Sequence, residues 1–114
     1  MDDNHDSADA VALILQMEGH NVKAVYTGSE ALSLAEEFQP HVVLLDIGMP
    51  QLNGYEVARR LRDEPWGKKV LLIAQSGWGH SDDLRRSQEA GFNLHLTKPI
   101  DFQKLKEFFV ASMA

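Results

Sequence analysis

The sequence predicts an α/β fold in which a parallel sheet is covered by helices on both faces. Two short runs, 42–45 and 70–74, are wholly apolar, as in strands that are buried on both sides. Helical patterns separate these runs, and strand–helix alternation at this spacing is typical of a parallel sheet. The 114 residues fit one domain, residues 1–114, and an apolar content of 44% is enough to form a core.

The expected elements follow from these patterns and from their end signals. Strands are expected at Asn21–Tyr26, Val42–Asp46, Val70–Ala74 and Leu94–Thr97. Helices are expected from Asp6 or Ser7 to Glu18, from Thr27 to the residue before Pro40, through Tyr55 and Leu61, from Ser81 to Gly91, and from Asp101 through Met113. Thr27 and Glu30 have the spacing of a capping box, which satisfies free N–H groups at a helix start. The alternation therefore accounts for the chain without a linker or a repeat.

Composition and charge exclude several classes of protein. There is no cysteine, so disulfides and thiolate metal sites are excluded. No apolar stretch approaches the roughly 20 residues of a membrane span, and a cytoplasmic location without membrane contact is expected. The net charge of −6 argues against direct binding to nucleic acid, which requires a basic face. Two arginine clusters, Arg59, Arg60 and Arg62 and then Arg85 and Arg86, are interpreted as solvated helix faces.

Asp46 is the most informative residue of the sequence. It ends the apolar run 42–45 and precedes the loop Ile47-Gly48-Met49-Pro50. Open α/β sheets place their chemistry at the carboxyl ends of the strands, and a carboxylate oxygen can attack phosphorus directly to form an acyl phosphate. Taken singly, Asp46 also fits a loop cap, Ser76 a turn residue and Lys98 a surface lysine.

Five motifs, taken in order, carry a family resemblance. They are Asp2-Asp3-Asn4, Asp46-Ile47-Gly48-Met49-Pro50, Asn53-Gly54, Ser76-Gly77 and Thr97-Lys98-Pro99. The set resembles the receiver domain of two-component response regulators over essentially the whole chain, and faintly resembles receivers fused to hybrid sensor histidine kinases. Ser76 lies thirty and Lys98 fifty-two residues after Asp46, as in that family. The resemblance implies a flavodoxin-like (βα)5 three-layer sandwich with the parallel strand order 2-1-3-4-5.

The resemblance also implies that Asp46 is the phosphoacceptor and that Mg²⁺ is the cofactor. Asp2 and Asp3 would hold the ion, one directly and one through water, together with Asp46 and the backbone carbonyl of Gly48. Magnesium suits this role because it takes one or two carboxylates and phosphate oxygens while it keeps several waters. Three carboxylates in one pocket repel one another, so without a cation the site is expected to have a raised affinity for protons and metal.

Lys98 and Ser76 would contact the phosphoryl group itself. By resemblance, Lys98 pairs first with Asp46 and then with a phosphoryl oxygen, while the hydroxyl of Ser76 bonds another. His95, three residues before the lysine, occupies the switch position of the family; its other interpretation is a half-exposed strand histidine without a switching role. The output surface for a downstream partner is expected on the face formed by residues 81–114.

The acid pair, Asp2 and Asp3, lies close to the start of the sequence. In the family, an apolar strand of about half a dozen residues precedes it, whereas here only Met1 does. The first strand is therefore expected to be truncated, which would leave a vacant position between strands 21–26 and 42–46 with unpaired groups on both. A truncated sequence is the favoured explanation, with a segment of another chain or a rearranged sheet as alternatives. If the sequence begins at its natural terminus, low stability and a weakened metal site are expected.

The expected function is a phosphoryl-accepting signalling switch of a two-component phosphorelay, and not an enzyme in the usual sense. The phosphoryl group would come from a phosphohistidine on a histidine kinase or a histidine phosphotransfer domain. The first alternative is a degenerate receiver, which binds proteins without taking phosphate because its acid pair is displaced. The second is a phosphohydrolase with an aspartate nucleophile. Such enzymes resemble one another in a second acid two residues after the nucleophile, where this sequence has Gly48.

Overall fold

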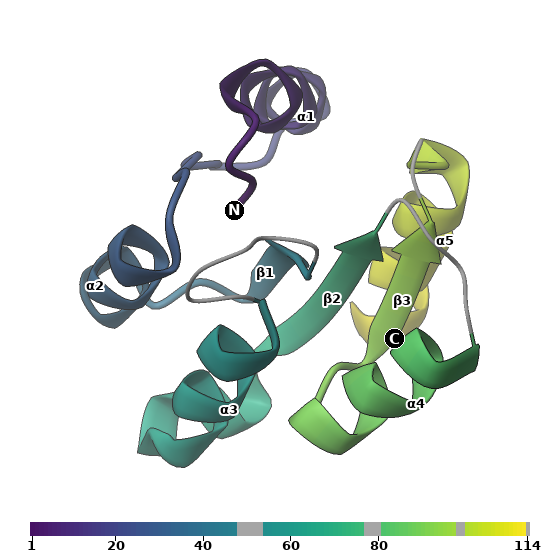
Figure 1. The fold of residues 1–114 in the computed structure, drawn as a ribbon. Helices are drawn as coiled ribbons and strands as arrows, with labels where there is room; N and C mark the ends of the chain where they lie inside the picture. Colours follow the sequence, from purple (N-terminus) through teal and green to yellow (C-terminus); the bar gives the residue numbers. More distant parts are fainter. Residues whose placement is uncertain (48–53, 77–80, 98–99, 114) are drawn as a thin grey trace.

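Helices alternate with parallel strands along the chain (Figure 1). The computed structural model describes residues 1–47, 54–76, 81–97 and 100–113. The helices are α1 (His5–Met17), α2 (Gly28–Phe38), α3 (Gly54–Asp63), the 3₁₀ helix η1 (Pro65–Lys69), α4 (Ser81–Ala90) and α5 (Phe102–Met113). The strands are β1 (Val42–Asp46), β2 (Leu71–Ser76) and β3 (Leu94–Thr97). The predicted α/β alternation is confirmed in these elements.

The three strands form one parallel sheet in the order β1-β2-β3. Leu45 of β1 lies opposite Ala74 of β2, and Ser76 of β2 lies opposite Thr97 of β3. Because the strands are parallel, their carboxyl ends meet at one edge of the sheet. Asp46 and Ser76, the last residues of β1 and β2, therefore lie at that edge.

The sheet is the middle layer of three. On one face, Leu72 and Ala74 of β2 belong to a buried cluster that includes side chains of α2, α3 and α4. On the other face, Ile73 is buried with Leu15 of α1 and Leu105 of α5. Figure 1 accordingly shows α4 and α5 on opposite sides of β3. Successive side chains of β2 point to opposite faces, so the apolar run serves both layers and the predicted three-layer arrangement is confirmed.

The strand expected at Asn21–Tyr26 is not formed, and the predicted five-strand order is wrong for the described residues. Their sheet contains three strands, which correspond to the last three of the expected order. Met1 and Asp2 lie between the 21–26 segment and β1. The amide of Asp2 donates to the carbonyl of Val25 (3.2 Å), the amide of Asp46 donates to the carbonyl of Met1 (3.0 Å), and the Met1 ammonium donates to the carbonyl of Leu44 (2.6 Å). Two residues provide too few ladder hydrogen bonds to define a strand on either side.

The helix ends follow the local signals in the sequence. Helix α1 begins one residue earlier than expected, because the side-chain oxygen of Asn4 accepts from the amide of Ser7 (3.1 Å) and caps it. Gly19 follows the helix with φ of 97°, as predicted. Thr27 Oγ1 accepts from the amide of Glu30 at 3.1 Å, and Asp101 caps α5 in the same manner. The helix start predicted at Thr27 is therefore confirmed.

The interpretation of Arg62 as a solvated side chain is wrong. Its guanidinium donates to the carbonyls of Gly67 (2.9 Å), Val70 (2.7 Å) and Gly91 (2.7 Å), and to the side-chain oxygen of Asn93 (2.8 Å). These acceptors lie at the end of η1, before β2 and after α4. Burial lowers the pKa of the Arg62 guanidinium from its ordinary value. Arg62 therefore joins three parts of the chain, which the sequence pattern of α3 did not indicate.

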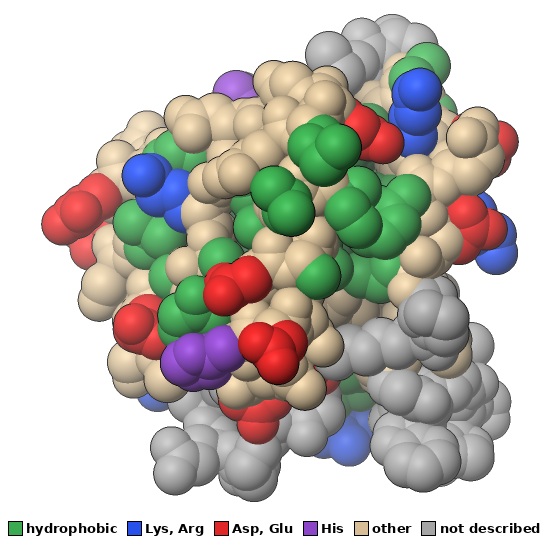
Figure 2. Space-filling view, turned by 90° about the horizontal axis from the view of Figure 1, so that it is seen from above, with side chains coloured by type: hydrophobic (Ala, Val, Ile, Leu, Met, Phe, Trp, Pro, Cys, Tyr) green, Lys and Arg blue, Asp and Glu red, His purple; other side chains and the backbone are tan. Residues whose placement is uncertain are grey.

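Helix α1 presents hydrophobic side chains to the surface as well as to the core. Leu13 and Met17 are exposed, and 36% of the surface of Ile14 is exposed as well. Seen from above, hydrophobic side chains gather in the middle of the face where α1 lies nearest the viewer (Figure 2). Among the described residues, no helix is long and apolar enough to cross a membrane.

Candidate functional site

Three carboxylates meet at the carboxyl edge of the sheet. Asp46 ends β1, and Asp2 and Asp3 precede α1. One oxygen of each carboxylate lies within 4.8 Å of the other two. Asp2 and Asp46 are buried, with 2% and 7% of their surface exposed, whereas Asp3 is exposed. The structure therefore brings together the three acids that the sequence predicted as one site.

Backbone hydrogen bonds hold the acid pair beside Asp46. The amide of Asp46 donates to the carbonyl of Met1, and the amide of Asp2 donates to the carbonyl of Val25. The Asp2 carboxylate in turn accepts from the amide of Asn4 at 3.0 Å, which orients it at the start of α1. The displaced acid pair that would define a degenerate receiver is not observed.

The donor set of this cluster fits a magnesium ion. All three side chains offer oxygen atoms, which are the ligands that Mg²⁺ prefers, and none offers nitrogen or sulfur. Two of the carboxylates are buried, so water screens their mutual repulsion poorly and a divalent cation would relieve it. Asp3 is exposed, which suits a ligand that reaches the ion through water.

Gly54 begins α3 in close contact with the site. A Cβ atom at this position would lie 2.8 Å from the carbonyl oxygen of Asp46 and 2.9 Å from Cγ2 of Ile47. Real Cβ atoms do not approach backbone so closely, so any larger residue would push α3 away from the end of β1. The glycine of the Asn53-Gly54 motif is thus explained by packing against the backbone of Asp46.

Ser76 and His95 also lie together. Ser76 Oγ lies 2.9 Å from Nε2 of His95. The other ring nitrogen, Nδ1, lies 2.8 Å from Oγ of Ser87 on α4. Sequence reasoning missed Ser87, because α4 is polar along its length and gives no apolar stripe that would identify its inner face.

Several predicted site residues lie outside the described part of the chain. They are Gly48, the expected source of a backbone metal ligand, and Lys98, the expected partner of Asp46, together with Met49, Pro50, Asn53, Gly77 and Pro99 of the motifs. Their roles remain predictions.

A cavity adjoins the acid cluster on the side of α1 and α5. Its volume is about 480 Å³, and it is lined by Asp2, Ser7, Ala10, Val11, Ile14, Gln75, Ile100 and Phe102. Gln75 is 4% exposed, and its side-chain oxygen Oε1 has no hydrogen-bond partner among the described residues. Sequence reasoning missed this buried amide as well, since it follows the apolar run of β2 and adjoins Ser76.

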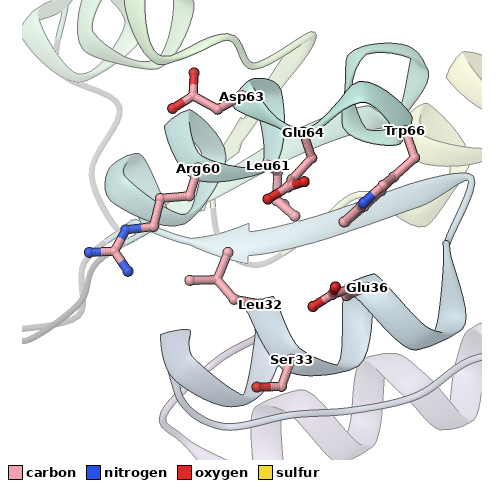
Figure 3. A pocket seen from close by; sticks show the side chains of 8 residues that line it. All are labelled: Leu32, Ser33, Glu36, Arg60, Leu61, Asp63, Glu64 and Trp66. Carbon is pink, nitrogen blue, oxygen red and sulfur yellow. The ribbon is translucent and has the colours of Figure 1, made fainter.

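A second cavity, of about 330 Å³, lies between α2 and the segment of α3 and η1 (Figure 3). Leu32 of α2 faces Leu61 of α3 across it, and the indole of Trp66 lies at one end. None of the three clustered aspartates lines this cavity. The chemistry of the carboxyl edge is therefore separate from it.

Comparison with known proteins shows the family of the chain. The family described as response regulator receiver domain matches residues 1–109. The "Uncharacterized 14.6 kDa protein in sodA1 3'region" of Leptolyngbya boryana is 35% identical over 101 residues, which cover 89% of this chain and 77% of that protein. "Probable histidine kinase 2" of Oryza sativa subsp. indica is 32% identical over 103 residues; they cover 82% of this chain and 10% of that protein.

A solved structure shows the same fold. It is the co-crystal structure of the Saccharomyces cerevisiae histidine phosphotransfer signaling protein Ypd1 with the receiver domain of its downstream response regulator Ssk1. The match has a TM-score of 0.82 at 24% identity and covers 92% of this chain and 79% of that chain. The protein belongs to the response regulator receiver domain family, whose members are switches of two-component signalling and not conventional enzymes.

Proposed function

We propose that Asp46 accepts a phosphoryl group in a Mg²⁺-dependent reaction and thereby switches the protein between two signalling states. The observation that carries this proposal is the convergence of three carboxylates at the carboxyl edge of the sheet, two of them buried. One buried acid there would suffice for a structural role. Three carboxylates together repel one another, which is unfavourable unless a cation binds between them.

The donor of the phosphoryl group is a phosphohistidine on a histidine kinase or a histidine phosphotransfer domain. A carboxylate oxygen of Asp46 attacks phosphorus; the new O–P bond forms as the P–N bond breaks, and the imidazole leaves with the electron pair. Asp2, Asp3 and Asp46 would hold Mg²⁺, which neutralises charge on the phosphoryl oxygens. Ser76, and by resemblance Lys98, would contact the remaining oxygens.

The proposed setting is a cytoplasmic phosphorelay in which the chain acts as a single receiver domain, residues 1–114. Ile14 of α1, which is 36% exposed, lines the same cavity as Asp2 and offers an apolar contact for the donor domain. The face formed by residues 81–114 is the proposed output surface. The comparison with a rice histidine kinase and with the yeast Ypd1–Ssk1 complex supports partners of the histidine kinase or phosphotransfer class.

Intact mass spectrometry after incubation with acetyl phosphate tests the proposal. We expect the protein to gain one phosphoryl group with Mg²⁺ and none after Mg²⁺ is chelated. Asp46→Asn should remove the gain, because the amide is no nucleophile towards phosphorus. Glu36→Gln, which changes an exposed carboxylate of α2, is the matched control and should react as the unmodified protein does.

Folded protein that gains no phosphoryl group from either acetyl phosphate or a phosphorylated donor domain would contradict the proposal. The degenerate receiver, a phosphorylation-independent binding module, would then be the better description. A gain that persists in Asp46→Asn would contradict the assignment of the acceptor.

A further inference from the structure

The imidazole of His95 forms a bridge between the edge of the sheet and α4. Nε2 lies 2.9 Å from Ser76 Oγ, and Nδ1 lies 2.8 Å from Ser87 Oγ. Ser76 and Ser87 are each 2% exposed, so water cannot replace either hydrogen bond without repacking. The bridge therefore places one titratable ring between two buried hydroxyl groups.

Strand register explains why these three side chains meet. His95 of β3 lies opposite Ala74 of β2, and Ser76 is two residues further along β2 on the same face. The neighbours of His95 on β3, Leu94 and Leu96, pack into the cluster on the side of α1 and α5. The histidine must therefore point to the opposite face, which α4 covers (Figure 1).

The two hydrogen bonds are coupled through the position of one proton. A neutral imidazole has one N–H donor and one acceptor nitrogen, and the hydrogen bond at one nitrogen decides which form is present. If Nδ1 carries the proton, Nε2 accepts and Ser76 must donate into the ring. If Nε2 carries the proton, it donates to Ser76, and the hydroxyl of Ser76 donates its own proton to an acceptor other than the ring.

The second form is the one that phosphorylation requires. A phosphoryl oxygen only accepts hydrogen bonds, so Ser76 can contact it only as a donor. Ser76 and Asp46 end adjacent strands at the same edge of the sheet. While His95 is neutral and keeps its contact with Ser76, Ser76 can donate towards a phosphoryl group on Asp46 only if Nε2 donates to Ser76 and Nδ1 accepts from another group.

We propose that Ser87 is that group and acts as a positioning residue for the switch. Its hydroxyl donates to Nδ1 and thus holds the proton of His95 on Nε2. The proton of Ser76 is then directed to a phosphoryl oxygen on Asp46. The same chain of hydrogen bonds links the phosphorylated site to α4 and hence to the proposed output face. This inference rests on the proposed phosphorylation of Asp46.

Nitrogen-15 NMR of the histidine rings tests the proposal together with the rate of phosphorylation. The protein is labelled with ¹⁵N-histidine, and His95→Phe identifies the signals of His95 by their loss. With Mg²⁺ and beryllium fluoride, a mimic of the phosphoryl group, we expect a neutral His95 with its proton on Nε2. Ser87→Ala should shift the population towards the form protonated on Nδ1.

The rate of phosphorylation by acetyl phosphate should fall in Ser87→Ala by about threefold to tenfold, the factor that corresponds to the net contribution of one hydrogen bond. Ser33→Ala removes an exposed serine hydroxyl from α2 and is the matched control; neither readout should change. A merely structural role of Ser87 would lower stability without moving the proton of His95.

Two results would overturn the proposal. One is a Ser87→Ala variant with the ring signals and the rate of the unmodified protein, and the other is a proton on Nδ1 in the beryllium fluoride complex. In protein without beryllium fluoride, Ser87→Ala should change the ring signals of His95 even if Asp46 cannot be phosphorylated. Failure of the bridge is thus distinguishable from failure of the proposed function, which would show as absent phosphorylation in the unmodified protein.

Discussion

Gln75 is a buried amide on the face of the sheet that packs against α1 and α5. It alternates with Ser76, so the two side chains point to opposite faces of β2. In the part of the chain that the structure describes, the side-chain oxygen of Gln75 has no hydrogen-bond partner, and apolar side chains such as Val11, Ile14 and Phe102 line the cavity around it. A buried polar atom without a partner costs about 1–3 kcal/mol of stability.

Replacing Gln75 with leucine is therefore expected to stabilise the protein. The change removes the unpaired oxygen and adds apolar surface next to a buried cluster, so the free energy of unfolding should rise by about 1 kcal/mol. Urea denaturation monitored by circular dichroism measures it. Gln75→Glu, which has nearly the same shape, should lower stability because it buries a charge. A lower stability of Gln75→Leu would contradict the assignment of an unsatisfied group.

Single residues differ in how far the sequence predicts them. Asp46 was predicted at the carboxyl edge of the sheet because it ends a strand, whereas Ser76 was assigned to the same site only through its spacing in the family motifs. Asp2 was predicted from motif spacing, but its burial beside β1 depends on two backbone hydrogen bonds, from Asp2 to Val25 and from Asp46 to Met1. Ser87 could not be predicted, since its contact with His95 depends on how α4 docks on the sheet.

At the scale of elements, the guanidinium of Arg62 adds hydrogen bonds to the packing between neighbouring elements. It extends from α3 and donates to carbonyl groups at the end of η1, before β2 and after α4. Gly91 follows α4 with φ of 99°, and its carbonyl oxygen accepts hydrogen bonds from both Nε and Nη2 of Arg62. One charged side chain thus satisfies several acceptors at the ends of three neighbouring elements.

Arg62→Lys is expected to destabilise the protein despite the retained charge. A lysine ammonium has three donors and lacks the planar fork, so it cannot reach all of these acceptors and leaves partly buried carbonyls unpaired. The free energy of unfolding should fall by about 2–4 kcal/mol. Arg60→Lys, on the exposed face of the same helix, should change it by less than about 0.5 kcal/mol. Equal effects of the two changes in urea denaturation would contradict the role of Arg62.

Elements were predicted well where short-range signals determine them. The caps of α1, α2 and α5 are local, and the third strand was predicted with its observed bounds, Leu94–Thr97. The segment 21–26 carries the alternating side chains of a strand, and Val22 and Val25 indeed pack on opposite faces. It forms no strand because strand identity also requires a partner, which is a property of the assembled sheet and not of the segment.

In the whole molecule, the acid cluster is where the N-terminal segment, β1 and the start of α1 meet. Asp2 is hydrogen-bonded through its backbone to Val25 and through its carboxylate to the amide of Asn4, and Asp46 is hydrogen-bonded to Met1. Repulsion among the three carboxylates therefore acts between separate parts of the fold. A cation that joins them should stabilise the folded state as a whole, since an unfolded chain does not hold the three acids together.

Mg²⁺ is accordingly expected to raise the melting temperature. At a Mg²⁺ concentration one hundred times the dissociation constant, binding adds about 2.7 kcal/mol to the free energy of unfolding, which corresponds to a rise of roughly 10 °C in melting temperature for a domain of this size.

Asp46→Asn should act in two opposite ways. It removes one of three like charges, so the melting temperature without Mg²⁺ should rise, while the further increase on adding Mg²⁺ should largely disappear. Differential scanning calorimetry measures both shifts, with Glu36→Gln as the control for a surface carboxylate. If Asp46→Asn and Glu36→Gln respond to Mg²⁺ alike, the ion acts by general screening and the three carboxylates do not form its site.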